Sequence, residues 1–198
     1  MDKKFILYPL YKNRFLILSC VMLIFGTFFG MSMLRIIPKE ISVNLFGFIS
    51  NSSSEFVNIF LNRFSLPFII LTGIYFSGNS IFGSFAVPAI VFINGFLFGF
   101  ENALNFKFSG MNHIVLSLII FFTSTVFIDF LLLIMSEVSI YSSRQIIKCL
   151  SDKNAEISHY NAKNITVKYF GFTVIIAVIS IISATFYKFI QPILWFSF

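Results

Sequence analysis

The chain has 198 residues, of which 58% are hydrophobic and only 11% are charged, and its mean hydropathy is +0.92. A water-soluble domain carries about twice that share of charged residues, so this composition excludes an ordinary soluble domain. The net charge of +6 comes from basic residues scattered around the ends of apolar stretches, which indicates membrane orientation and not nucleic-acid binding.

Five apolar stretches, each close to the length that crosses a bilayer, divide the chain. A helix rises about 1.5 Å per residue, so about 20 apolar residues cover the roughly 30 Å hydrocarbon layer. The stretches are continuously apolar and not alternating, which favours helices over the strands of a membrane barrel. We therefore predict an all-α integral membrane protein, a single polytopic domain over residues 1–198 built as a bundle of about five transmembrane helices. The predicted crossings are Phe15–Leu34, Phe64–Phe82, Ser84–Phe100, Ile114–Met135 and Tyr169–Ile190.

The first stretch follows a lysine-rich N-terminal segment, an arrangement that is also found in secretory signals. Its apolar run is too long for a signal core, and no small-residue cleavage site follows it. We therefore predict a retained membrane anchor. Within this stretch, Gly26 and Gly30 have the GxxxG spacing that lets two helix backbones approach closely in lipid.

The segment Ile36–Arg63 separates the first two crossings. Ser52 and Glu55 have the spacing of a helix capping box, and apolar residues follow at helical spacing. We expect a short amphipathic helix on the outer leaflet that leads into the second crossing, with Pro67 in the first turn of that crossing. This segment is either a site of partner contact or only a connector that follows the membrane surface.

The second and third stretches hold no charged residue from Phe64 to Phe100 and are rich in glycine. They form either a tight helical hairpin with its turn at the inner face, or two broken helices that re-enter the outer face without crossing. We favour the hairpin because each stretch approaches the lower limit of about 17 residues for a crossing. The glycines predict closely packed helices within one bundle. The predicted helix-packing residues are Gly26, Gly30, Gly73, Gly78, Gly83, Gly95 and Gly99.

Three polar side chains interrupt the apolar stretches. Asp129 is the only acid well inside a predicted crossing, about 9 Å from its inner end. Because a carboxylate in lipid is costly unless it is paired or protonated, Asp129 is either part of an ion or proton relay or a structural group. In the structural interpretation, which we prefer, it pairs with a cation such as Arg14 or Lys168 or reaches cytoplasmic water. Asn79 and Asn94 are interpreted as hydrogen-bonding groups between helices in preference to substrate ligands.

The longest polar segment, Ser136–Lys168, is predicted to be cytoplasmic, with the fourth helix extending into it. If the N-terminus is cytoplasmic and the C-terminus lies outside, nine basic residues fall on the inner side and five on the outer side. This distribution agrees with the positive-inside rule. The inner residues are Lys3, Lys4, Lys12, Arg14, Arg144, Lys148, Lys153, Lys163 and Lys168, and the outer ones are Arg35, Lys39, Arg63, Lys107 and Lys188.

The sequence contains no nucleotide-binding, metalloprotease or nucleophile motif and no paired carboxylates at catalytic spacing. Cys20, Cys149, His113 and His159 lack the spacing of metal ligands. We therefore predict a protein that is not an enzyme and that uses no metal or other cofactor. The remaining classes are a transporter, a scaffold and an accessory subunit.

A pattern of phenylalanine and glycine in the third stretch points to a family. Phe92, Gly95, Phe96 and Gly99 match a Phe-x-x-Gly-Phe-x-x-Gly pattern that resembles the second half of the signature of the stage II sporulation protein M family. Members of that family look like five-helix bacterial membrane proteins of a similar length. The layout of most of the chain is similar to theirs, including the glycines of the first crossing.

The first half of the family signature, Gly-x-Ser-x-x-Gly-x-Pro, is matched with a departure at its proline. Asn79 stands between Gly78 and Ser80. Pro88 comes five residues after Gly83 instead of two. The specific residues of the resemblance span only the central part of the chain.

The resemblance implies a non-catalytic scaffold in a bacterial cell membrane. Such a scaffold recruits the peptidoglycan-degrading stage II sporulation proteins P and D for septal wall thinning and engulfment during endospore formation. Relatives outside sporulation look like accessory subunits of ABC-type exporters, so the alternative is a membrane transport component beside an ATPase or permease. A membrane immunity or stress protein is a third class, for which the sequence offers no discriminating residue.

Overall fold

A computed structural model describes residues 14–38, 40–44, 56–108, 111–151 and 162–195, without the side chains of residues 105, 111–123, 162–164 and 190–195. Within these ranges the chain is helical and contains no strand. Each of the five long helices contains a stretch that is long and apolar enough to cross a membrane, so the chain is a multi-pass, all-α membrane protein. The helices are α2 (Arg14–Met33), α4 (Phe56–Gly78), α5 (Gly83–Phe108), α6 (Met111–Ser151) and α7 (Ala162–Trp195).

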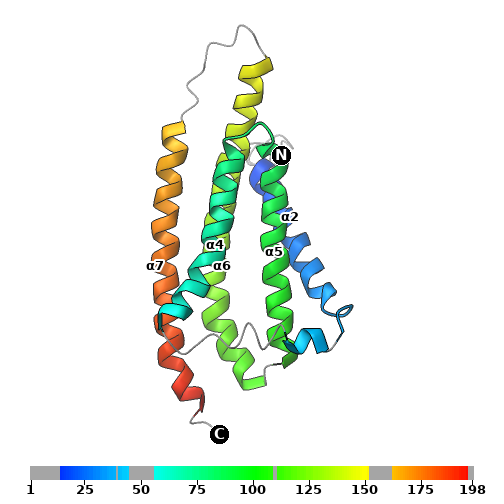
Figure 1. The fold of residues 1–198 in the computed structure, drawn as a ribbon, viewed down its shortest axis with the longest axis vertical. Helices are drawn as coiled ribbons and strands as arrows, with labels where there is room; N and C mark the ends of the chain where they lie inside the picture. The colour runs from blue at the N-terminus through cyan, green and yellow to red at the C-terminus, as the bar shows by residue number, and fades with distance from the viewer. Residues whose placement is uncertain (1–13, 39, 45–55, 109–110, 152–161, 196–198) are drawn as a thin grey trace, which may run out of the picture.

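Successive helices, including α2 and α4, run in opposite directions along the bundle (Figure 1). As a result α2, α5 and α7 point one way, and α4 and α6 point the other. One end of the bundle, called the turn end below, holds the start of α2, the turn at residues 79–82 and the end of α6. The opposite end holds the ends of α2, α5 and α7.

The longest helix, α6, packs against all four others. Around it the order is α2, α5, α4 and α7, because the backbones of neighbours in this order approach each other. Among the residues that the structure describes, the backbone of α2 does not approach α4 or α7. The bundle is therefore a fan of four helices around α6 and not a closed ring.

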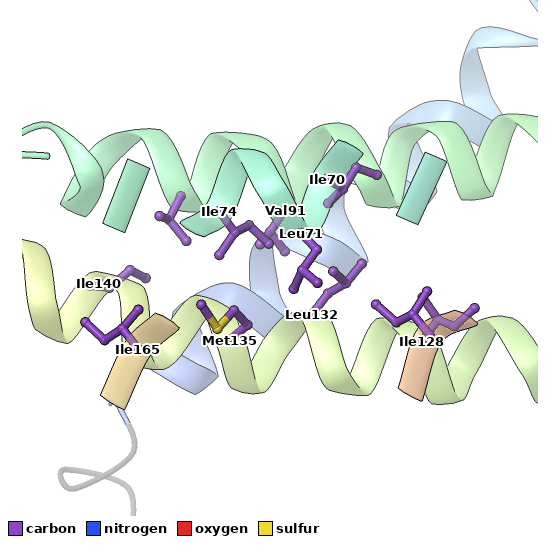
Figure 2. Close-up of a cluster of buried hydrophobic side chains, with 11 residues drawn as sticks. Ile70, Leu71, Ile74, Val91, Ile128, Leu132, Met135, Ile140 and Ile165 are labelled. Atoms are coloured by element: carbon purple, nitrogen blue, oxygen red, sulfur yellow. The ribbon is translucent and has the colours of Figure 1, made fainter. Parts of the chain in front are cut away.

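Buried aliphatic side chains join α4, α5, α6 and α7 (Figure 2). Leu71 and Ile74 of α4, Val87 of α5, Met135 of α6 and Ile176 of α7 are all completely buried. Large apolar side chains also point away from the bundle, which is unusual in a protein surrounded by water and expected in one surrounded by lipid. The phenylalanines that are more than half exposed include Phe25, Phe28, Phe82, Phe85 and Phe189.

The backbones of α2 and α5 approach each other closely at the two GxxxG pairs. Gly26 and Gly30 of α2 lie directly on the backbone of α5, and Gly95 and Gly99 of α5 lie directly on the backbone of α2. A Cβ atom at any of the four would collide with a carbonyl oxygen of the facing helix, so only glycine permits this approach. The carbonyl oxygens belong, in the same order, to Phe92, Phe96, Leu23 and Thr27.

The other glycines that we expected to pack closely differ among themselves. Gly78 and Gly83 flank the turn between α4 and α5 and face serines of α6. A Cβ atom at Gly78 would lie 2.8 Å from the Cα atom of Ser139, and one at Gly83 would lie 2.8 Å from the Cβ atom of Ser143. Gly73 has more room, because the nearest atom to a Cβ placed there is 3.5 Å away.

The second and third stretches form unbroken helices that meet in the tight turn at residues 79–82, as in the hairpin interpretation. However, α4 begins at Phe56, so Pro67 lies well inside the helix, and the prediction that it lies in the first turn is wrong. The reason is that the predicted amphipathic segment continues directly into the crossing, with Ile59 buried against the bundle. The first turns of α4 are inclined to the rest of the helix (Figure 1), and a proline inside a helix, here Pro67, is a common cause of such a bend.

The fourth helix extends past its predicted crossing, as expected. α6 has 41 residues, which at about 1.5 Å per residue is roughly twice the thickness of the hydrocarbon layer. A short helical segment covers residues 40–44. Several expectations concern residues or side chains outside the described part. These are Lys3, Lys4, Lys12, Lys39, Ser52, Glu55, His113, Lys153, His159 and Lys163.

The contact between α2 and α5 predicts that Gly95→Ala destabilises the protein by about 1–3 kcal/mol, because the added methyl group overpacks a backbone contact. The control is Gly171→Ala on α7, where a Cβ atom would meet nothing within 4 Å. This control should be neutral or stabilise by up to about 1 kcal/mol through helix propensity. The measurement is the free energy of unfolding in mixed micelles with increasing SDS. Equal stability of the two variants would contradict the contact.

Candidate functional site

Two of the three polar residues singled out in the sequence lie together inside the bundle. Asn94 of α5 donates a hydrogen bond of 2.7 Å from its Nδ2 atom to the Oδ1 atom of Asp129 on α6. Both side chains are buried, with exposed fractions of 8% for Asn94 and 9% for Asp129. The amide donor replaces part of the hydration that the carboxyl group would have in water.

The Asp129–Asn94 pair lies well inside the bundle. At about 1.5 Å per residue, Asn94 is about 16 Å along α5 from its start at Gly83. Beyond this pair, α6 stays packed in the bundle past Met135. Its Ser143 is fully buried, and its hydroxyl accepts a hydrogen bond of 3.1 Å from the backbone N–H of Ser84 beside the turn.

The structure does not place the expected cations beside Asp129. Arg14 is exposed at the start of α2, where its guanidinium lies 4.9 Å from the ring centroid of Phe15. Lys168 is exposed on α7. The side chain that bonds Asp129 is therefore an amide of a neighbouring helix, and the expected pairing with a cation at the same depth is not seen in the described residues.

Asn79 lies apart from the Asp129–Asn94 pair, in the turn after α4. Its Nδ2 atom donates a hydrogen bond of 2.9 Å to the carbonyl oxygen of Tyr75. The last carbonyl groups of a helix lack partners within that helix, so this bond helps to close the end of α4. This bond is local to the end of α4.

Serines of α6 make further contacts between helices that the sequence analysis did not single out. The hydroxyl groups of Ser136 on α6 and Ser19 on α2 form a buried hydrogen bond of 2.8 Å. Ser139, also fully buried, packs against Gly78. Together with Ser143, these residues follow one face of α6 at helical spacing, which is the signal that could have revealed them.

α4 and α7 are joined by two tyrosines. The rings of Tyr75 and Tyr169 stack with their centroids 4.5 Å apart. The hydroxyl of Tyr75 is 3.0 Å from Oγ1 of Thr166, and that of Tyr169 is 3.1 Å from Oγ1 of Thr72. These hydrogen bonds between hydroxyl groups fix the register of the two helices in an apolar setting.

Charged groups meet near the end of the bundle opposite the turn end. Arg63 of α4 and Glu101 of α5 are half-buried and attract each other electrostatically. The guanidinium of Arg63 also lies 6.0 Å from the ring centroid of Tyr187 on α7. In the sequence Arg63 is recognisable only as an outer basic residue, because Glu101 and Tyr187 are distant from it along the chain.

The arrangement offers polar contacts between helices and one buried carboxyl–amide pair. The described residues contain no group of three or more His, Cys, Asp or Glu side chains that could hold a metal ion. Cys20 and Cys149 are both free thiols. No family model, curated protein or solved structure matches the chain.

The Asp129–Asn94 bond predicts a measurable coupling in a double-mutant cycle. Asn94→Ala should lower the free energy of unfolding by about 1–3 kcal/mol, because the buried carboxyl group loses its donor. The same change should cost less in an Asp129→Leu background, with a difference of about 0.6–1.7 kcal/mol as for other bonds between membrane helices. SDS-induced unfolding measures all four variants.

Asn102→Ala is a matched control on α5, because the Nδ2 atom of Asn102 donates to the carbonyl oxygen of Phe98 in its own helix. This change should show no coupling to Asp129→Leu. A coupling as large for Asn102 as for Asn94 would argue against the observed pairing.

Proposed function

We propose that the protein is a non-catalytic membrane scaffold that recruits peptidoglycan hydrolases, the role implied by its resemblance to the stage II sporulation protein M family. The observation that carries the proposal is that polar side chains inside the bundle bond to each other across helices. Asp129 and Asn94 bond to each other, and so do Ser136 and Ser19. Polar groups used in this way join helices and support a rigid platform better than a passage for solutes.

In this proposal the protein acts in a bacterial cell membrane, and its partners are membrane-associated wall hydrolases that resemble stage II sporulation proteins P and D. The process is the thinning of septal wall and the engulfment of the forespore. The wall lies outside the cytoplasmic membrane, so the hydrolases would meet the end of the bundle opposite the turn end.

Deletion of the gene in a spore-forming host should leave thick septal wall and arrest engulfment, as seen by electron microscopy of sporulating cells. Wall hydrolases should co-purify with the tagged protein from detergent extracts. The control is the stable Gly171→Ala variant, which should restore engulfment to the deletion strain. Normal septal thinning without the gene, or a host that makes no spores, would overturn the hydrolase role.

A second candidate is a transport component, such as an accessory subunit of an ABC-type exporter. The specific observation in its favour is the buried carboxyl group of Asp129 inside the bundle, because acids within membrane-spanning helices often serve ion or proton movement. Asp129→Asn should then reduce flux in reconstituted vesicles by at least about tenfold, as expected for loss of an essential titrating group. Unchanged flux, or the absence of an ATPase from the detergent eluate, would count against this candidate.

For the orientation, we propose that the turn end faces the cytoplasm. The described basic side chains are balanced, with four near each end, so the proposal draws on the excess of lysines in the rest of the sequence. A membrane-impermeant maleimide added to intact cells should leave Cys149 near the turn end unlabelled. In a Cys149→Ser background it should label Lys107→Cys near the opposite end. The reverse labelling would invert the topology.

A further inference from the structure

Two arginines from different helices share one aromatic ring at the turn end. The guanidinium of Arg14 on α2 lies 4.9 Å from the ring centroid of Phe15, and that of Arg144 on α6 lies 4.3 Å from the same centroid. The separation of the two guanidinium carbon atoms therefore cannot exceed the sum of these two distances. Each cation is attracted to the ring, whereas the two like charges repel each other, so an anion close to both guanidinium groups would be favourable.

The Arg14–Arg144 pair lies at the level where the bundle leaves the membrane. Ser143, next to Arg144, is hydrogen-bonded to Ser84 beside the α4–α5 turn, so the pair and the turn are at a similar height. Phe82 and Phe85 at this turn are 75% and 82% exposed, which indicates that lipid reaches this level. Both arginines are exposed and so are accessible to a headgroup.

Two further charged side chains that the structure describes lie near the pair on α6. Lys148 lies one turn beyond Arg144 on the same face of α6, and Glu137 lies about two turns before it. These four described side chains carry three positive charges and one negative charge. The local excess of positive charge favours an anionic ligand.

An exposed apolar stripe begins at Arg14 and continues along α2. Leu18, Val21, Phe25 and Phe28 are 37%, 41%, 66% and 67% exposed, and their spacing places them on the same face as Arg14. A soluble anion would contact only the arginines. A phospholipid would contact both the arginines, with its phosphate, and the apolar stripe, with an acyl chain.

We propose that Arg14 and Arg144, held by Phe15, bind the phosphate of an anionic phospholipid at the turn end of α2 and α6. Guanidinium groups suit this role because their fixed, planar donors match the oxygens of a phosphate. Basic pockets between transmembrane helices are known to hold anionic headgroups. This site is independent of the proposed scaffold function, because it concerns only lipid binding by the isolated protein.

Native mass spectrometry of the purified full chain measures the binding of dioleoylphosphatidylglycerol and, for comparison, dioleoylphosphatidylcholine. We expect selective retention of phosphatidylglycerol by the native protein. Arg14→Gln/Arg144→Gln should weaken this retention by about 10- to 30-fold, as expected for the loss of two basic residues at an anionic surface. The matched control is Arg35→Gln/Lys107→Gln, which removes two exposed charges near the opposite end and should leave retention unchanged.

A second variant pair separates binding from folding. Arg14→Lys/Arg144→Lys keeps the net charge but loses the planar fork, so it should retain phosphatidylglycerol less well than the native protein and better than the glutamine pair. Glycerol 3-phosphate at millimolar concentration should not displace the lipid, because it lacks acyl chains. Equal loss in the control pair, no loss in the glutamine pair, or full displacement by glycerol 3-phosphate would each overturn the proposed lipid site.

Discussion

The contact of α2 with α5 through four glycines is the constraint on which the rest of the bundle depends. In lipid, no hydrophobic force brings apolar helices together, so association relies on close packing and on hydrogen bonds. The glycines allow backbone against backbone, where each helix meets carbonyl oxygens of the other. Gly95 immediately follows Asn94, so the contact that positions Gly95 against α2 also holds the Asn94 amide opposite Asp129.

The polar contacts of α6 fix how neighbouring helices are positioned along it. Asp129 meets α5, Ser136 meets α2, and Ser143 meets the turn between α4 and α5. These contacts lie at different heights, so sliding of α2 or of the α4–α5 hairpin along α6 would break at least one of them. Apolar packing alone is nearly indifferent to such sliding in lipid, whereas a hydrogen bond has a defined partner. The serines of α6 thus set register, although each contributes modest energy.

The sequence predicts the helices well because continuous apolar stretches leave few alternatives in a membrane. It also indicates the glycines of α2 and α5, since GxxxG is a local spacing. It does not reveal the partner of Asp129, because that depends on which face of α5 turns toward α6. Because Ser136 is polar, the crossing was predicted to end before it. However, Ser136, Ser139 and Ser143 are buried against other helices. Pro67 was misplaced because nothing local separates the segment before it from the crossing.

The pairing of α2 with α5 has a consequence for biogenesis. The two helices are parallel and are separated in the chain by α4, so their contact has to wait until α5 has been synthesised. About 75 residues follow Met33 before α5 is complete, which takes roughly 4–15 s at ordinary rates of translation. During that interval the face of α2 that carries Gly26 and Gly30 has not yet met α5. A nascent chain therefore passes through a stage in which this glycine face of α2 is exposed to lipids, to insertion factors or to another copy of the chain.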